Sequence, residues 1–529
     1  MSKLKNIPVI DLFAGPGGLG EGFSSVVNGK NRVFDIKLSI EKDENAHKTL
    51  QLRSFSRQFS VNRLPEKYYD VLRATSLKSR EMLTKELFEA YPSQAKKAKA
   101  ETWHAELGGK DLPKRTVDRR IEQELKDNKN WVLIGGPPCQ AYSLVGRSRV
   151  GGIGENDHRV YLYKEYLRII ARHHPAVFVM ENVKGLLSAK LNGEKIFDWI
   201  KNDLEVPGKI FKWYKSPEYK IYSLVTDTVK KDSDFLVKAE DYGIPQKRHR
   251  VILLGVRNDI KHIPGVLKTK HDKIALKEII GQLPKIRSGM NRKYIGYETV
   301  LKDGKEKRKR SYRKINDSDE NWEKLVTNFH NEILSGNGRF KDDACRNFKS
   351  PSAGKGAEFV KSQNTINKKS DLYNWFHDGN LNGIANHESR SHLSQDLKRY
   401  LFASIYSKKY RKSPKLSDYE RHNKELLPDH HNAKSGKFSD RFRVQLPGEP
   451  ATTVTSHISK DGHYFIHYDT NQCRSLTVRE AARIQTFPDN YLFCGSRTHQ
   501  YHQVGNAVPP FLANQIGKIV ENILKKNYE

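Results

Sequence analysis

Short apolar runs that stop at glycine, proline or an acidic residue recur along the chain and predict buried strands. They occupy residues 7–13, 33–40, 131–134, 176–185 and 250–256. Near-continuous apolar strands of this kind are typical of a mostly parallel sheet that is covered on both faces. The segment 14–27, between the first two runs, fits a helix, so the chain opens as an α/β unit.

Helical segments separate these runs. Apolar residues spaced three and four apart mark one helix just before residue 176: Tyr161, Tyr163, Tyr166, Leu167, Ile169 and Ile170. Further helices are expected over residues 66–90, 116–127 and 508–526, the last with proline at its start and lysine at its finish. A loop is expected around Pro92, within a mostly helical stretch over 52–130.

The character of the chain changes after residue 256, where a domain boundary is expected. The following region is polar and basic, and residues 302–314 hold eight basic and two acidic side chains. The fold of residues 257–440 is not readable from periodicity. Apolar order returns with a strand-like segment at 442–459 and a helix-like segment at 475–487.

The overall charge indicates a polyanionic partner. Among 529 residues, 94 are lysine or arginine and 62 are aspartate or glutamate, which leaves a formal net charge of +32. Such an excess is typical of proteins that bind nucleic acid. Hydrophobic residues make only 36% of the chain, but aromatic residues make 10%, so we expect a folded protein with a large basic surface.

Cysteine use indicates a reducing compartment. The four cysteines are Cys139, Cys345, Cys473 and Cys494. None belongs to a CxxC pair, which excludes a disulfide framework and a cysteine-rich zinc module. The histidine-bearing stretches 386–392 and 429–432 have no cysteine partners and no HExxH pattern, so polar loops are expected there and no metal. No apolar stretch approaches 18 residues, so an exported or membrane-spanning protein is not expected.

A glycine-rich turn follows the first predicted strand. Gly15, Gly17 and Gly20 satisfy the spacing GxGxxG, and Glu41 lies 21 residues beyond the last of them, at the end of the second strand. Glycines let a backbone approach a ligand closely, and an acid at the next strand end can bind ribose hydroxyls. By itself this pattern fits NAD, FAD or S-adenosylmethionine about equally, and a purely structural turn less well.

Two motifs place a thiol and a carboxyl at the ends of successive strands. In GGPPCQAYS, the paired glycines and prolines form a rigid turn that exposes Cys139 at the carboxyl end of a strand, where α/β sheets bind ligands. In MENVKG, Glu181 ends the next strand. The alternatives are a buried, inert cysteine and a solvated carboxylate. If the two strands are neighbours, thiol and carboxyl converge on one pocket.

Three other features carry weaker signals. YGIPQKRHRVILLG sets Arg248 and Arg250 two residues apart, so both can lie on one face of an extended segment and hold a planar edge, or form basic surface on an edge strand. In QVGNAVPP, Asn506 is either a ligand residue or a cap of the last helix. The stretch 302–314 is either a solvated loop or a phosphate clamp, and the charge of the whole chain favours DNA contact.

In combination, these motifs resemble the DNA cytosine-5 methyltransferases, most closely the bacterial restriction–modification and orphan type. The likeness covers residues 7–50, 131–187, 240–256 and 440–520, and the motifs follow the family's order. PPCQ, ENV and the segment with Gln246, Arg248 and Arg250 are together highly specific, whereas the glycine turn alone is not.

The resemblance implies covalent catalysis on a flipped-out cytosine. Cys139 would add as a thiolate to C6 and so make C5 nucleophilic. Glu181 would hold N3 and the exocyclic amine, Arg250 would bind the carbonyl oxygen, and Arg248 would orient the site. A cytosine inside a duplex cannot reach such a pocket, so the base would leave the stack and Gln140 would help to fill the gap.

The resemblance also implies a cofactor site for S-adenosylmethionine, and contacts to DNA. Phe13 would stack on adenine, and Glu41 would bind the ribose hydroxyls. Further cofactor contacts would come from Ala14, Gly15, Gly17, Gly18, Leu19, Pro137, Asn506 and Val508. The family's Asp-Ile beside the adenine amine is missing here, and Glu106 is a candidate substitute. DNA contacts would come from Gln140, Ser143 and Arg479, with Arg483 as an alternative to Arg479.

The family's domain plan completes the expectation. Residues 1–256 and 496–529 would form a Rossmann-like catalytic domain, a mostly parallel sheet with helices on both faces. Residues 257–475 would form a target recognition domain, with a hinge at 476–495. A monomer would act on double-stranded DNA in the prokaryotic cytosol, beside a restriction endonuclease for the same sequence. The same chemistry on tRNA, a non-catalytic DNA-binding relative, and a flavin or nicotinamide oxidoreductase remain alternatives.

Overall fold

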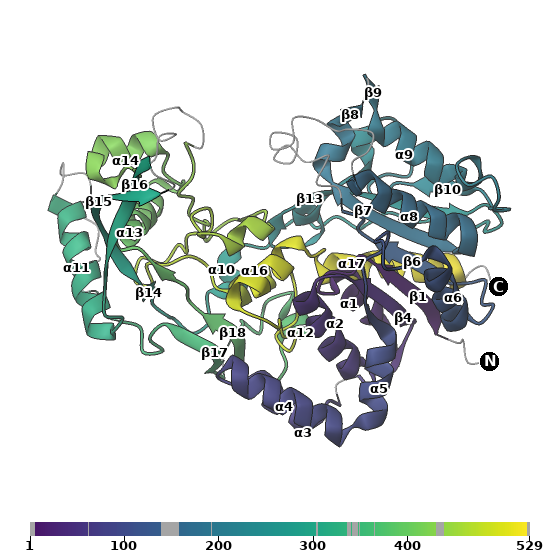
Figure 1. Ribbon diagram of the computed structural model, residues 1–529, viewed down its shortest axis with the longest axis horizontal. Coiled ribbons are helices and arrows are strands. Elements are labelled where there is room, and N and C mark those ends of the chain that lie inside the picture. The colour runs from purple at the N-terminus through teal and green to yellow at the C-terminus, as the bar shows by residue number, and fades with distance from the viewer. Residues whose placement is uncertain are drawn as a thin grey trace.

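The computed structural model shows two lobes joined by a central segment (Figure 1). The described residues are 6–61, 63–138, 158–191, 193–302, 305–335, 340, 348, 350–363, 365–429 and 439–525. One lobe holds a large sheet and both ends of the chain. The other, called the distal lobe below, contains residues 289–302, 305–335 and 391–429, whereas residues 356–363 and 365–388 pack with the central segment and the inserted helices.

The large sheet is mostly parallel, as its apolar runs predict. Its strands are β1 (Ile7–Leu12), β4 (Phe34–Glu41), β5 (Thr102–His104), β6 (Val132–Gly135), β7 (Val177–Val183), β10 (Tyr219–Tyr222), β11 (Leu236–Lys238) and β13 (His249–Arg257). They lie in the order β10-β13-β7-β6-β1-β4-β5, and β11 also pairs with β13. All pairs from β7 to β5 are parallel, whereas β13 runs antiparallel to β7, β10 and β11. The apolar run at 250–256 did not reveal that reversal.

Helices cover both faces of the sheet. One face carries α1 (Gly18–Ser24) and α17 (Pro510–Lys525), and the other carries α6 (Lys114–Leu125), α8 (His158–His173) and α9 (Ile196–Glu205). The stripe predicted on α8 is buried at Tyr166, Leu167, Ile169 and Ile170. Burial of such a side chain stabilises the fold by about 1.5–3 kcal/mol. Short hairpins are formed by β2 (Val27–Asn28) with β3 (Asn31–Arg32) and by β8 (Lys190–Leu191) with β9 (Glu194–Lys195).

The chain segment that connects β4 to β5 forms an additional helical layer. It contains α2 (Glu44–Arg57), α3 (Glu66–Arg73), α4 (Leu77–Ala90) and α5 (Pro92–Glu101). The expectation of a loop around Pro92 is wrong, because Pro92 begins α5, and a proline in the first turn of a helix forfeits no hydrogen bond. The expectation of one helix over 66–90 is also wrong, because the chain forms two helices there. Ser76 caps the second one by accepting from the Ser79 amide.

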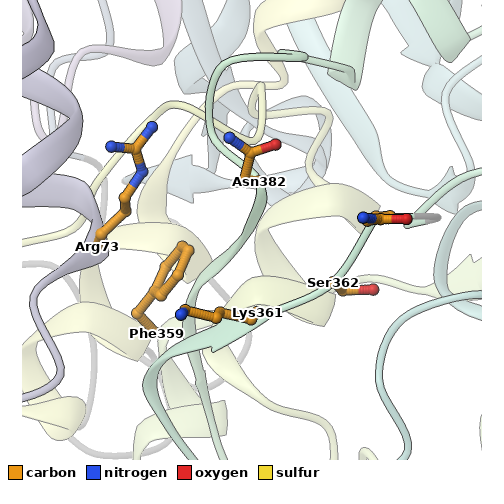
Figure 2. Close-up of a pocket in the computed structure, with 6 residues that line it drawn as sticks. Arg73, Phe359, Lys361, Ser362 and Asn382 are labelled. Atoms are coloured by element: carbon orange, nitrogen blue, oxygen red, sulfur yellow. The ribbon is translucent and has the colours of Figure 1, made fainter.

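The inserted helices contact the hairpin of β17 and β18. Arg80 of α4 donates to Glu358 of β17 (Gly356–Lys361) at 2.6 Å, and both side chains are buried. β17 is antiparallel to β18 (Gly383–Glu388). A cavity of about 570 Å³ lies at this junction, lined by Arg73, Phe359, Lys361, Ser362, Gln363 and Asn382. Figure 2 shows Arg73 opposite Phe359 and Lys361; none of the site residues expected from the sequence lines this cavity.

The distal lobe has a core of its own. Its elements are β14 (Gly289–Met290), β15 (Arg292–Lys302), β16 (Lys305–Lys314), α11 (Asp319–Ser335), β19 (Ser391–His392), α13 (Ser394–Tyr410) and α14 (Leu416–His422). The short helix α12 (Tyr373–Phe376) packs in the central segment instead. The core contains Trp322, Val326, Leu397, Tyr400, Leu401 and Phe402. The basic stretch 302–314 lies largely in β16, which pairs antiparallel with β15 in a long hairpin.

The chain then returns to the sheet through a buried segment. It contains β20 (Ala451–Thr452), α15 (Val478–Ile484) and α16 (Arg497–Asn506), and packs on α10 (Leu276–Ile280). The helix expected over 475–487 is confirmed as α15, whose cap Thr477 accepts from the Glu480 amide. The strand expected over 442–459 is mostly irregular: β20 pairs with β12 (Gln246–Lys247), and Val444 forms a single bridge with Ile466.

Buried histidines make the fold sensitive to acid. Burial lowers the pKa of His387 to about 4 and also lowers the pKa values of His392 and His467. The neutral His387 ring bonds Thr477 and the Pro284 carbonyl. The unfolded chain binds protons below its ordinary histidine pKa near 6.5, while the folded chain does not, so stability falls as pH falls from 7 toward 4.

We therefore expect the free energy of unfolding to drop between pH 7 and 5, by about 2 kcal/mol for His387 alone. Thermal or urea unfolding across this range measures the drop. The variant His387→Gln removes one titrating ring, so its stability should depend less steeply on pH than that of the unaltered chain. Identical pH profiles for the two proteins would contradict this assignment.

Two further properties concern only the described part of the chain. No helix there is both long enough and apolar enough to cross a membrane. The described residues also hold no group of three or more His, Cys, Asp or Glu side chains that could bind a metal. Of the two histidine-bearing stretches, residues 430–432 lie outside the described part.

Candidate active site

The glycine turn after β1 has a backbone shape that lets another group approach it closely. Phe13 has a φ of +56°, Gly15 of +58° and Gly17 of +93°, so the chain leaves the strand through left-handed conformations. A Cβ on Gly18 would lie 2.2 Å from the Val508 carbonyl oxygen, so only glycine fits there. The turn therefore exposes backbone at the carboxyl edge of the sheet, where α/β folds bind ligands.

Glu41 braces this turn from the neighbouring strand. One carboxylate oxygen accepts from the Gly15 amide at 2.8 Å and the other from the Asp43 amide at 2.7 Å. Burial raises the pKa of Glu41, while these two amides oppose the shift. Each oxygen keeps a second lone pair that can accept from a ligand hydroxyl. Glu106 follows β5 nearby and pairs with Lys42 at 3.1 Å.

Asp11 is a site residue that motif spacing did not single out. It is 1% exposed, and neither carboxylate oxygen has a hydrogen-bond partner of good geometry in the described chain. A Cβ on Gly20 would lie 3.0 Å from its Oδ2, which places the carboxyl under the glycine turn. Burial raises its pKa to about 8. An unpaired buried acid at this place fits a ligand that carries positive charge, as S-adenosylmethionine does on its sulfonium and amine.

A carboxylate and a guanidinium meet on the adjacent strands β7 and β13. Arg250 Nε lies 2.7 Å from Glu181 Oε1, and both side chains are only about 15% exposed. The strands are antiparallel neighbours, with Val183 opposite Arg250. A Cβ on Gly136 would lie 3.2 Å from the other oxygen of Glu181. The pair therefore faces the turn of residues 136–138.

That turn leads directly to the expected nucleophile. β6 ends at Gly135 beside Met180 of β7, so the predicted adjacency of the two strands is confirmed. Pro137 is buried and Pro138 half-buried. Cys139, Gln140 and Ser143 lie outside the described residues.

Arg248 has a different environment from Arg250. It is buried, and its Nη1 donates to the carbonyls of Val454 at 2.8 Å and Gly505 at 3.4 Å. Burial, with the neighbouring Arg250 charge, holds its pKa well below the usual range, and Glu181 opposes this shift. Arg248 thus ties the start of β13 to the returning segment. The two arginines therefore bind different partners and do not form one exposed pair.

The two ends of the chain meet at the glycine turn. Val508 lies against Gly18, and the exposed Asn506 ends α16 with its amide 3.4 Å from the ring of His502. Asn506 does not cap α17, which begins at Pro510. The structure therefore brings the late motif QVGNAVPP beside the first one.

The expectation that Arg479 contacts phosphate is wrong. Arg479 is fully buried, and its guanidinium donates to the carbonyls of Ala385, Pro488 and Tyr491 at 2.7 to 3.0 Å. Arg483 is equally enclosed and pairs with Asp489 at 2.6 Å. Every residue of α15 is buried, so no face of this short helix carries surface charge. A motif alone does not reveal that burial.

Comparisons with known proteins agree with this geometry. The family described as C-5 cytosine-specific DNA methylase matches residues 88–522. The chain is 31% identical over 540 residues to the type II methyltransferase M.Bpa9945I of Bacillus paralicheniformis, covering 98% of this chain and 100% of the relative. It is 26% identical over 401 residues to the type II methyltransferase M.DdeI of Desulfomicrobium norvegicum, covering 73% and 71%.

One solved structure supports the fold. It is a crystal structure of an E. coli prophage-encoded protein assigned as a DNA modification methyltransferase. Its TM-score is 0.51 at 21% identity, and the match covers 98% of this chain and 100% of that one.

Proposed function

The chain belongs to the family of C-5 cytosine-specific DNA methylases, and from this premise we propose the part that each site residue takes in the reaction. The protein is an S-adenosylmethionine-dependent DNA (cytosine-5-)-methyltransferase. The observation that carries the assignment of roles is the pair of Glu181 and Arg250, which faces the turn leading to Cys139.

Cys139 is the nucleophile of the proposed mechanism. Its thiolate adds to C6 of the cytosine, which converts the ring into an enamine and makes C5 reactive. S-adenosylmethionine supplies the electrophilic methyl group. Loss of the C5 proton and elimination of the thiolate then restore the aromatic ring and free Cys139.

Glu181 and Arg250 bind the cytosine ring on either side of this step. Glu181 holds N3 and the exocyclic amine, and Arg250 holds the carbonyl oxygen. Because they already form an ion pair, the two groups are oriented before the base arrives. Arg250 stabilises negative charge on the carbonyl oxygen, and Glu181 mediates proton transfer to N3. Arg248 positions β13 through the carbonyls of Val454 and Gly505.

The cofactor lies over the glycine turn in this proposal. Phe13 contacts the adenine, Glu41 the ribose hydroxyls, and Glu106 the edge near the adenine amine. The methionine portion lies over Asp11 and is bound by Ala14, Gly15, Gly17, Gly18 and Leu19. Pro137, Asn506 and Val508 close the site.

Double-stranded DNA lies between the two lobes. Residues 1–256 with 496–529 act as the catalytic domain, 257–475 as the recognition domain and 476–495 as the hinge. The cytosine leaves the duplex to reach Glu181, and Gln140 and Ser143 contact the DNA around the gap. The support for this division is that α17 completes the sheet core while the distal lobe has a core of its own.

The β15–β16 hairpin grips the DNA backbone. Arg292 stacks on Tyr312 and Arg308 on Tyr297, with guanidinium carbons 4.0 and 4.7 Å from the ring centres. By the strand register, the opposite face of the hairpin carries four exposed cations: Lys293, Lys307, Lys309 and Arg313. Glu298 lies on the same face and pairs with Lys309 at 3.7 Å, so cations exceed acids there by a wide margin. Such an excess suits phosphates, because it neutralises charge without reading bases.

Replacement of Lys307, Lys309 and Arg313 by alanine should weaken binding to all duplexes alike. The slope of log affinity against log salt should become shallower by about 0.9 for each phosphate that is no longer neutralised. Fluorescence anisotropy over a salt series measures both quantities. The control is Lys48→Ala/Lys85→Ala/Lys114→Ala, which removes the same charge from exposed sites elsewhere. Equal slopes for the two triple variants would rule out the grip.

Methyl transfer itself provides the test of the proposed function. Purified protein with tritiated S-adenosylmethionine should label duplex DNA and not tRNA, and sequencing of 5-methylcytosine should show one short site. DNA that carries 5-fluorocytosine at this site should become covalently attached to the protein in the presence of cofactor. Labelling of tRNA in preference to DNA, or no adduct, would contradict the proposal.

The relatives suggest the biological setting. Several are named type II methyltransferases, so this enzyme protects host DNA against a restriction endonuclease that cuts the same sequence. It acts as a monomer in the cytosol and forms no stable complex with that endonuclease.

A further inference from the structure

Three side chains of the β15–β16 hairpin converge on a carboxylate from another part of the distal lobe. Oδ2 of Asp429, which lies beyond α14, accepts from the Tyr297 hydroxyl at 2.5 Å and from the Tyr294 hydroxyl at 3.4 Å. Nη2 of Arg310 lies 4.0 Å from the same oxygen. The side chains of Asp429 and Arg310 are 60% and 43% exposed, so a large ligand can reach this group of donors. Tyr294, Tyr297 and Arg310 are called the tyrosine–arginine cluster below.

The hairpin itself positions the tyrosine–arginine cluster. By the strand register Tyr297 lies opposite Arg310, on the face that does not carry the exposed lysines. The rings of Tyr294 and Tyr297 pack edge to face with their centres 5.8 Å apart, and Arg308 stacks on Tyr297. The two hydroxyls and the guanidinium are therefore held together by neighbours on the same hairpin.

The carboxylate of Asp429 is not the only group that holds the hairpin in place. Gln395 of α13 accepts from the Tyr294 amide at 3.2 Å and donates to the Tyr294 carbonyl at 2.8 Å. Arg310 also donates to the main-chain carbonyl of Asp429, a contact that does not depend on the Asp429 side chain. The hydrogen bond from Tyr297 lowers the pKa of Asp429, so this side chain is an anion at neutral pH. The cluster thus binds an anionic oxygen, which Asp429 supplies in the free protein.

A phosphate of DNA offers the cluster the same kind of acceptor. Its anionic oxygens accept from hydroxyls and guanidinium groups, and tyrosine and arginine are common donors to DNA phosphates. The major groove is about 12 Å wide and admits a two-stranded ribbon, which then has a phosphate backbone on either side. A hairpin in this groove would present its lysine face to one backbone and the tyrosine–arginine cluster to the other.

We propose that Tyr294, Tyr297 and Arg310 form a binding site for a phosphodiester of duplex DNA, and that Asp429 occupies this site until DNA displaces it. Asp429 therefore weakens binding to every duplex alike, because phosphates carry no sequence information. This inference rests on the proposed function, in which the hairpin lies against the backbone of duplex DNA.

Two variants of this site change DNA affinity in opposite directions. Asp429→Asn removes the competing charge and should tighten binding to unrelated duplexes about fivefold, since the phosphate no longer displaces an anion. Its slope of log affinity against log salt should stay unchanged, because the same phosphates are bound. Arg310→Gln removes a cation of the site, so it should weaken binding and make the slope shallower by about 0.9. Fluorescence anisotropy over a salt series, without cofactor, measures both quantities.

A double variant and two matched controls separate this site from net charge. Asp429→Asn/Arg310→Gln should bind no more tightly than Arg310→Gln, because the freed site is incomplete. Glu425→Gln removes the same charge from an exposed acid that pairs with Lys398 at 3.7 Å. Arg421→Gln removes an exposed cation of α14 that pairs with Asp418 at 3.7 Å. Both controls should change affinity by less than about twofold and leave the salt slope unaltered.

Several results would overturn the proposal. Weaker binding by Asp429→Asn would make its carboxylate a mere anchor of the hairpin. An equal gain in Glu425→Gln would reduce the effect to net charge, and a gain that persists in the double variant would place it outside the cluster. Inorganic phosphate in place of chloride, at constant ionic strength, should preserve the gain; its loss would assign the site to free phosphate. A protein that binds no duplex and transfers no methyl group would instead contradict the proposed function.

Discussion

Replacement of Cys139 by serine is expected to reduce methyl transfer by a factor on the order of 10⁴ or more. The reaction needs an anion to add to C6, and a thiol with an ordinary pKa near 8.5 supplies one far more readily than a hydroxyl. The acid facing the turn, Glu181, is engaged with Arg250 and the cytosine, so no second base is assigned to activate a serine. Incorporation of tritiated methyl into duplex DNA measures the loss.

The control for Cys139→Ser is DNA affinity, which should change by less than about threefold because phosphate contacts dominate it. The variant should also form no covalent adduct with 5-fluorocytosine DNA. Residual turnover within tenfold of the unaltered enzyme would remove Cys139 from its proposed role.

Replacement of Glu181 by glutamine is expected to reduce the maximal rate by about 10²- to 10⁴-fold, with little change in DNA affinity. The amide keeps the shape of the side chain, but it loses the carboxylate that pairs with Arg250 at 2.7 Å and the ability to transfer a proton to N3 as negative charge develops on the ring. Single-turnover kinetics with saturating cofactor and duplex isolates this step.

A matched control for Glu181→Gln is available beside β13, the strand that carries Arg250. Glu240→Gln changes an acid that pairs with His249 at 2.9 Å, and it should alter the rate by less than about threefold. Because Glu181 and Arg250 act as one unit, the double variant Glu181→Gln/Arg250→Lys should lose far less than the product of the two single losses. Fully multiplicative losses, or similar losses in both glutamine variants, would separate Glu181 from catalysis.

The strands and the order of the site motifs were predictable because the signals are local. An apolar run that ends at a turn identifies a strand regardless of its neighbours, and parallel strands bring their carboxyl ends to one edge. The adjacency of β6 and β7, which sets Glu181 against the turn before Cys139, followed from this rule. The break at Pro92 was misread because proline is compatible with both a loop and the first turn of a helix.

Burial and pairing of charges could not be read from the chain. Arg479 and Arg483 look like surface cations in sequence, and the fold encloses both among carbonyls contributed by distant segments. Asp11 shows the converse case, in which a carboxyl within the first strand becomes an unpaired buried acid once α1 covers it. A side chain's solvation depends on what packs over it, which is a property of the whole fold.

For this protein, residue order alone determined the α/β class, the basic character and the order of the motifs that match the family, since these depend on composition and short-range spacing. Only the tertiary structure decided which cations lie at the surface, how β13 reverses beside β7, and how Tyr491 comes to support a turn 475 positions earlier. Such contacts join segments whose separation along the chain carries no periodic signal, so packing and hydrogen bonding alone bring them together.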